Sequence, residues 1–270
     1  MAKRTIAKLS PCLLILYLIG ITPICEAQKK TSKLEGMWSD PPSTTLGTFC
    51  FFMCSDAGVA RLNTLLDEPK NDSRPFRELQ AEAKQAEREY IQARFTKVAL
   101  ETYPIDPVKD PGFSRCEPWG VARQMFAPHQ FEIRQRGRDI LEFHYGEWDS
   151  QRTIYMSSDK GLVNSQPSRM GYSVGHWEGE TLVVETSNIV PNIAMWTDLE
   201  HQARHSDQLR ILERYSRSDD GKVLQLTATL EDPGSLREPV VLKKMWRWAP
   251  ESHIARYKDC QIPTNLLKKE

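Results

Sequence analysis

The sequence from Tyr172 to Thr186 reads YSVGHWEGETLVVET and decides the fold class. Two short runs, Tyr172 to Trp177 and Thr181 to Thr186, enclose Glu178-Gly179-Glu180, a set of turn-forming residues. Two extended runs joined by a short glycine turn are typical of a β-hairpin. This stretch therefore predicts two neighbouring antiparallel strands.

The same pattern extends over most of the chain from Pro118 onward, where the period is two and turn residues separate the runs. A first short strand is expected at Gly36-Met37-Trp38, before the turn at Pro41-Pro42. About nine strands joined mainly by tight turns must close or stack to hide their edges. The sequence therefore predicts a mainly β fold, an antiparallel meander that forms a barrel or a strongly curved sandwich. The further expected strands are residues 130–135, 140–145, 152–156, 172–177, 181–186, 209–216, 223–230 and 240–248.

A helical hairpin is expected as an insertion at about residues 55–102. From Asp56 to about Leu66 apolar residues recur at helical spacing, and a second helix is expected to begin at Asp72 or Ser73 with Pro75 in its first turn. We expect the hairpin to pack on the domain through the apolar stripe of its second helix; the alternative is a partner-binding coiled coil. The stripe is Phe76, Leu79, Ala83, Ala86, Tyr90 and Ala93.

The start of the chain predicts export. A basic leader precedes an apolar run from Cys12 to Ile24, which is too short to span a bilayer comfortably. Cys25-Glu26-Ala27 then resembles a signal peptidase site. We therefore expect a signal peptide at residues 1–27, a mature single β domain at residues 28–270, and a periplasmic or secreted location. An uncleaved membrane anchor is the alternative, and no later stretch is apolar enough to span a membrane.

The charge composition of the chain argues against a nucleic-acid partner. The chain has 36 basic and 36 acidic residues and a formal net charge of zero, with charges of both signs interleaved. A nucleic-acid partner would normally require a basic patch that biases the total, so we expect none.

Four cysteines remain after cleavage: Cys50, Cys54, Cys116 and Cys260. An even number in an oxidising compartment predicts two disulfides, and all three pairings remain open. The alternative is a metal site, because Cys50 and Cys54 can present two thiolates on one helical face. No second close Cys/His pair completes such a site, so we expect disulfides and no metal.

The hairpin from Tyr172 to Thr186 holds the best candidate for chemistry, because alternation places Tyr172 and His176 on the same face. A loop of Glu178 to Glu180 would surround His176 with apolar partners: Leu182, Val184 and Thr186. A loop of only Glu178-Gly179 would bring instead Thr181, Val183 and Glu185, and Glu185 could then orient the imidazole.

Other polar groups carry weaker signals. His205-Ser206-Asp207 cannot form a catalytic triad, because adjacent strand residues point to opposite faces, so a turn or helix cap is expected. Glu213 and Arg214 are interpreted as solvated surface charge; the alternative is a buried glutamate beside His176, whose perturbed pKa could serve acid or base chemistry. The chain has no hydrolase elbow, phosphate loop, dinucleotide fingerprint or zinc-protease helix, and no cofactor is expected.

Aromatic side chains are numerous enough to line a pocket for a small, largely apolar molecule. The expected ligand-binding residues are Tyr155, Tyr172, His176, Trp177 and Trp246.

Two resemblances add to this reading. The stretch from Gly171 to Thr186, with His205-Ser206-Asp207, Glu213-Arg214-Tyr215 and Leu230-Glu231-Asp232-Pro233, resembles a family of exported bacterial proteins over roughly Cys116 to Trp248. That resemblance implies export but no particular chemistry. Gly36-Met37-Trp38 is similar to the Gly-x-Trp that opens the first strand of lipocalins, whose barrels hold small apolar ligands. The helical insertion departs from the lipocalin plan.

The leading functional hypothesis is an exported protein that binds a small apolar ligand in a β-barrel pocket. The first alternative is a lipocalin-like hydratase, cyclase or isomerase that uses His176 as acid or base, assisted by Tyr172 or Glu185. The second is an envelope protein that binds a partner through its helical hairpin.

Overall fold

The computed structural model describes residues 33–103, 117–157, 166–195 and 203–254. The chain divides into two units, Met1–Lys30 and Thr31–Glu270, and every described residue belongs to the second. The expected signal peptide lies outside the described residues. In the described part of the chain, no helix is both long enough and apolar enough to cross a membrane.

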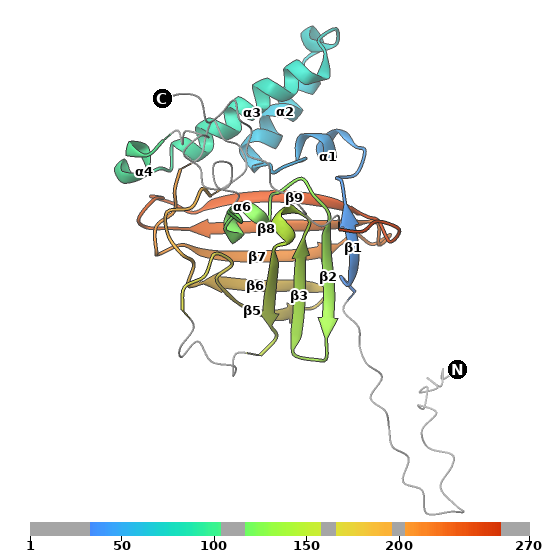
Figure 1. The fold of residues 1–270 in the computed structure, drawn as a ribbon. Helices are drawn as coiled ribbons and strands as arrows, with labels where there is room; N and C mark the ends of the chain where they lie inside the picture. The colour runs from blue at the N-terminus through green and yellow to red at the C-terminus, as the bar shows by residue number, and fades with distance from the viewer. Residues whose placement is uncertain (1–32, 104–116, 158–165, 196–202, 255–270) are drawn as a thin grey trace, which may run out of the picture. The chain divides into compact units, whose positions relative to one another are not determined.

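Nine strands close into a barrel in which each strand neighbours the next and β9 returns to β1 (Figure 1). The predicted barrel is therefore confirmed, and the expected strands agree with the observed ones to within one residue at nearly every end. One feature differs from the expected meander: β4 and β5 pair in parallel. The strands are β1 (Gly36–Ser39), β2 (Phe131–Arg136), β3 (Ile140–Tyr145), β4 (Gln151–Tyr155), β5 (Tyr172–Glu178), β6 (Thr181–Ser187), β7 (Arg210–Arg217), β8 (Val223–Glu231) and β9 (Val240–Trp248).

The β5–β6 hairpin turns on two residues, Gly179 and Glu180, because Glu178 pairs with Thr181. Gly179 has φ +61°, a left-handed conformation that glycine adopts without steric cost. The observed loop is neither of the two expected ones. Its register nevertheless places Thr181, Val183 and Glu185 on the face of His176, as the shorter expected loop did.

The helical insertion is confirmed with helices from Asp56 to Glu101, and a short helix that was not expected, α1, precedes it. Ser55 caps α2 by accepting a hydrogen bond from Gly58 N at 3.2 Å. Pro75 precedes α3 rather than lying in its first turn, and Ala93 is exposed after the helix ends, while Glu87 takes a buried position on the stripe. The helices before the main run of strands are α1 (Thr45–Phe49), α2 (Asp56–Asp67), the 3-10 turn η1 (Pro69–Asn71), α3 (Phe76–Gln92) and α4 (Lys97–Glu101).

The insertion covers an edge that the short strand β1 leaves open. β1 reaches β9 only at Trp248 and Arg247. Farther along the same edge, Cys54 exchanges two backbone hydrogen bonds with Lys243, at 2.9 and 2.7 Å. An uncovered strand edge invites pairing with another chain, so the insertion protects the sheet.

Aromatic rings fill much of the barrel interior. Phe131 lies at the centre, with ring centroids 5.1 Å from Phe143, 5.0 Å from Tyr145 and 5.2 Å from Trp246. The short helix α6 (Val121–Gln124) contributes apolar side chains to the same core. The interior is thus mainly apolar, which makes its polar members conspicuous.

Candidate functional site

Strand alternation places a carboxylate inside the barrel. Along β7 the buried residues are Ile211, Glu213 and Tyr215, and the intervening side chains are exposed. Glu213 is 0 % exposed. The expectation that Glu213 is a solvated surface charge is therefore wrong, because it shares the inward face with two apolar or aromatic residues.

Arg152 of β4 pairs with Glu213 across the interior. Its two terminal nitrogens donate to the two carboxylate oxygens at 2.9 and 2.7 Å. Burial lowers the pKa of Arg152, but the charge of Glu213, the two neighbouring tyrosines and the hydrogen bonds to Glu213 together outweigh burial and hold that pKa above its usual value. The guanidinium is therefore a cation, paired through two hydrogen bonds with the carboxylate of Glu213.

Further donors complete the coordination of Glu213. The Tyr215 hydroxyl donates to Oε2 at 2.6 Å and the Thr186 hydroxyl donates to Oε1 at 3.1 Å. Ser173 Oγ lies 2.9 Å from Thr186 Oγ1 and extends the set to β5. We call these five residues, Arg152, Ser173, Thr186, Glu213 and Tyr215, the Glu213 network.

Two tyrosine hydroxyls stay protonated beside the pair. Burial, and then the charge of Glu213, raise the pKa of Tyr215 well above its usual value. Burial likewise raises the pKa of Tyr145. Both phenols therefore keep their protons at physiological pH, and the Tyr215 hydroxyl donates to Glu213, whereas Tyr145 Oη is buried and has no hydrogen-bond partner among the described residues.

One donor of the network has no acceptor among the described residues. Arg152 Nε is fully buried and makes no hydrogen bond there, while the ring centroid of Phe143 lies 5.2 Å from the guanidinium carbon. A buried unsatisfied N–H group costs free energy, typically about 1–3 kcal/mol. An acceptor atom placed beside Nε would remove that cost.

The residues expected to carry catalysis lie on the outer face of the barrel. His176 pairs with Val183, its side chain is 53 % exposed, and its Nε2 lies 3.3 Å from Glu178. Glu185 is exposed on the same face, one register pair away, and Tyr172 is half-buried there. None of the three contacts the Glu213 network in the described contacts.

The expected ligand-binding aromatics divide between the two faces. Trp246 is buried in the aromatic interior, and Trp177 is 39 % exposed towards the end of β5. Tyr155 of β4 and Tyr172 of β5 stack on each other on the outer face of the barrel, with ring centroids 5.2 Å apart. The structure thus brings one expected residue, Trp246, into the interior core.

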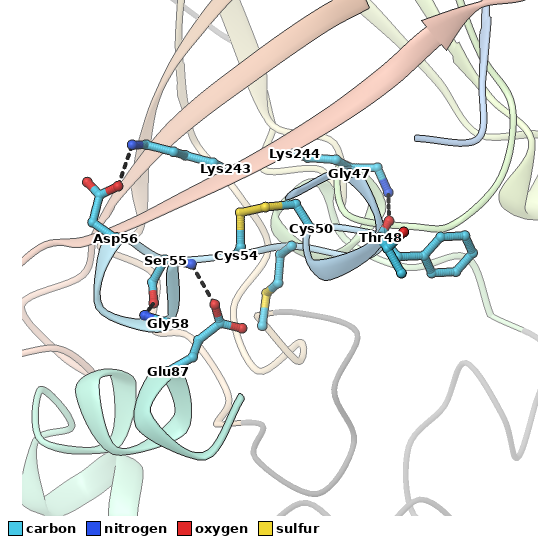
Figure 2. The surroundings of a disulfide bond; sticks show 12 residues. Gly47, Thr48, Cys50, Cys54, Ser55, Asp56, Gly58, Glu87, Lys243 and Lys244 are labelled. Atoms are coloured by element: carbon cyan, nitrogen blue, oxygen red, sulfur yellow. Dashed lines mark hydrogen bonds and ion pairs between the residues drawn. A yellow bond between two sulfur atoms is a disulfide. The ribbon is translucent and has the colours of Figure 1, made fainter. Parts of the chain in front are cut away.

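Cys50 and Cys54 form a disulfide that ties the end of α1 to the segment paired with β9 (Figure 2). The expected bridge is confirmed for these two cysteines. Cys116 and Cys260 lie outside the described residues, so their bond stays a prediction. Across the described ranges, no three His, Cys, Asp or Glu side chains are grouped to hold a metal ion.

His205, Ser206 and Asp207 form a turn, as expected. Ser206 Oγ accepts from Gln208 N at 3.0 Å, and Ser206 N donates to Asp232 at 2.7 Å. His205 is buried, which lowers its pKa, and Asp207 is exposed. These hydrogen bonds fix the segment around Ser206 against the segment around Asp232, so both motifs have a structural role.

Sequence reasoning missed the Glu213 network although a signal was present. Glu213 lies two residues from both Ile211 and Tyr215, and Arg152 lies two residues before Ile154. Side chains two residues apart in a strand point to the same face, so Glu213 and Arg152 share the inward face of their buried neighbours. Opposite charges at inward positions of two strands indicate an internal ion pair once the barrel is recognised.

Comparison with known proteins adds little. No family model and no curated protein matches the chain. Among solved structures, the fluorescent protein UnaG N57A mutant is similar, with 17% identity and a TM-score of 0.26, over 44% of this chain and 70% of that chain. A likeness this distant indicates no function.

Proposed function

We propose that the protein is an exported binding protein that holds a small, largely apolar molecule inside its barrel, against the Glu213 network. One observation carries the proposal. A charged pair, Arg152 and Glu213, is buried in an apolar and aromatic interior and keeps one N–H donor, Arg152 Nε, without an acceptor among the described residues.

The free-energy cost of burying such an ion pair supports a role for it in ligand binding. Removing two charges from water costs several kcal/mol, and a well-packed apolar pair of similar size is often as stable or more stable. Ligand sites typically combine apolar and aromatic walls with a small number of fixed polar groups that orient the ligand. The barrel interior has this composition, with Phe131, Phe143 and Trp246 beside the network.

The charges of Arg152 and Glu213 also restrict the charge of the proposed ligand. Glu213 already balances Arg152, so a ligand carboxylate would lie close to a like charge and be disfavoured. A neutral acceptor, such as a carbonyl or ether oxygen, can accept from Arg152 Nε without disturbing the pair. The proposed ligand is therefore an uncharged apolar molecule with one such oxygen.

Export rests on the basic leader, the apolar run and the small residues before Gln28. The resemblance of residues 171–186 to exported bacterial proteins agrees with it. Expression with the full leader, followed by N-terminal sequencing of the product from the periplasm or medium, tests it: a mature start near Gln28 is expected. An intact amino terminus in the membrane fraction would overturn the proposed export.

The binding proposal is tested by native mass spectrometry with solvent extraction on the mature protein. The informative variant is Arg152→Met with Glu213→Leu, because it removes both charges together and leaves neither one buried alone. The matched control is Arg136→Met with Glu142→Leu, an ion pair of 2.9 Å on an exposed hairpin.

The expected result is an apolar adduct on the wild type and the control, and a folded inner double variant without it. A folded inner variant that carries the same adduct would show that the network is structural. A wild type that carries no adduct and takes up no uncharged apolar dye would overturn the binding function.

A further inference from the structure

The ladder between β4 and β5 is one of the two shortest in the barrel wall, with two register pairs, as between β1 and β9. Strands β4 and β5 are joined only where Ile154 meets Ser173 and Tyr155 meets Val174, and this pair is parallel. Parallel pairing is slightly less stable per residue than antiparallel pairing. The ladders on either side are longer: β3–β4 runs from Ile140 to His144, and β5–β6 runs along both whole strands.

A second short ladder, between β1 and β9, is reinforced. Farther along β9, the backbone of Cys54 is hydrogen-bonded to that of Lys243, and Tyr90 Oη accepts a hydrogen bond from Val241 N at 3.4 Å. Arg217 lies over the rings of both Trp38 and Trp248. Between β4 and β5, the described contacts include the short backbone ladder and the stacked rings of Tyr155 and Tyr172.

Side chains that can move fill the seam between β4 and β5. Outside it, Tyr155 stacks on Tyr172 with an interplanar angle of 20°. Inside it, Gly175 leaves space that Ile154 and Met156 occupy, since an added Cβ would lie 2.8 Å from Ile154 Cγ2 and 3.0 Å from Met156 Sδ. A thioether chain adapts to new shapes without breaking a hydrogen bond.

The seam opens directly on the Glu213 network. Ser173, one of the joined residues, contacts Thr186, which donates to Glu213. Arg152 faces inward on β4, two residues before Ile154. A molecule that passed between the strands would therefore meet the network first.

We infer that the ligand enters and leaves the barrel sideways between β4 and β5, where Tyr155, Tyr172 and Met156 move apart. The inference rests on the proposed function. It gives a role to Tyr155 and Tyr172, which lie outside the barrel and do not contact the network in the described contacts.

A cysteine bridge across the seam tests the inference. Tyr155→Cys with Val174→Cys joins register partners of β4 and β5, both on the outer face. The matched control is Val174→Cys with Glu185→Cys, which joins register partners of β5 and β6 and shares one substitution. Intact mass verifies each bridge, and stopped-flow fluorescence measures uptake and release of 6-propionyl-2-(dimethylamino)naphthalene, an uncharged apolar probe with one carbonyl oxygen.

The bridged seam is expected to slow uptake and release at least about tenfold relative to the bridged control, with the equilibrium affinity nearly unchanged. Reduction of the bridge should restore both rates. Rates equal to those of the control would overturn lateral entry while leaving the binding function intact.

Two single variants give an independent readout. Met156→Ala and Tyr172→Ala each remove part of the seam filling, and both are expected to raise the uptake and release rates by about threefold or more. Unchanged rates in both would also overturn the inference. Failure of the binding function has a different signature: the wild type would not bind the probe, or the inner double variant Arg152→Met with Glu213→Leu would bind it equally well.

Discussion

Arg152 and Glu213 form a two-bond ion pair across the barrel interior, with 1% and 0% of their side chains exposed. Glu213→Leu alone leaves the guanidinium buried without a counter-charge, so we expect it to lower the free energy of unfolding by about 3–5 kcal/mol. Adding Arg152→Met should restore most of that loss. Urea denaturation of the two single variants and the double variant measures the coupling. Additive losses would contradict this account.

Gly36 packs its backbone against Trp248. A Cβ at Gly36 would lie 2.2 Å from the indole, and its φ of +130° disfavours any other residue. We expect Gly36→Ala to cost about 3 kcal/mol or more, because the backbone is strained at this φ and the Trp248 indole, packed against Trp38 and Arg217, must shift. Gly137→Ala is the control: its Cβ would meet nothing within 4 Å, so only the φ of +66° contributes, about 1 kcal/mol. Equal losses in thermal unfolding would argue against the Trp248 contact.

Lys244 should make the free energy of unfolding depend on pH. Its Nζ donates to the carbonyls of Ala127 at 2.7 Å, Phe126 at 3.1 Å and Phe51 at 3.3 Å, and burial lowers its pKa to about 7. The unfolded chain keeps this proton up to about pH 10.4. Between about pH 7 and pH 10 the unfolded state therefore binds more protons, and the Lys244 contribution to the free energy of unfolding rises with pH by up to about 1.4 kcal/mol per unit.

Lys244→Met should remove that slope, as measured by urea denaturation between about pH 6 and pH 9.5. Below about pH 7 both states hold the proton, so the contribution should be flat there. Lys243→Met is the control, because Lys243 lies on the same strand, is 40% exposed and pairs with Asp56 at 2.5 Å. A slope retained by Lys244→Met and lost by Lys243→Met would refute the assignment.

The disulfide closes a short loop beside the edge of β9 (Figure 2). Replacing Cys50 and Cys54 together by serine should lower the free energy of unfolding by about 2 kcal/mol, the loop-closure entropy for so few residues. Denaturation under non-reducing conditions measures it. The sequence predicts two disulfides without fixing their pairing, and the Cys50–Cys54 bond leaves Cys116 and Cys260 for the second, so we expect the mature oxidised protein to have no free thiol. A thiol count above zero would contradict the second bond.

The strand boundaries followed from the sequence because alternation and turn residues are local signals. Gly179 marks the β5–β6 turn whatever the rest of the chain does, and the helical spacing of apolar residues from Asp56 marks α2. The parallel pairing of β4 with β5 was not predictable, since a strand pattern carries no direction. The hydrogen bonds of Ile154 and Ser173 depend on where the connection between the strands returns.

The candidate site was harder to predict for a physical reason. A lone glutamate in an alternating strand is usually solvated. Glu213 is buried because its face of the strand becomes the inside of the barrel once the barrel closes. His176 shares a strand face with Tyr172, as the alternation predicted, but that face is the outer one. The pairing partner of Glu213 lies 61 residues earlier in the chain, beyond any local pattern.

His176 provides the last test, because it separates the binding hypothesis from the enzyme hypothesis. The side chain is 53% exposed on the outer face, so His176→Ala should change the free energy of unfolding by less than about 0.5 kcal/mol and leave probe affinity unchanged. Thr186→Val, inside the barrel, should cost about 1 kcal/mol and weaken binding, because Glu213 loses one donor. Equilibrium titration with the uncharged probe compares the two variants. A loss of binding or turnover in His176→Ala, with Thr186→Val unaffected, would move the functional site to the outer face of the β5–β6 hairpin.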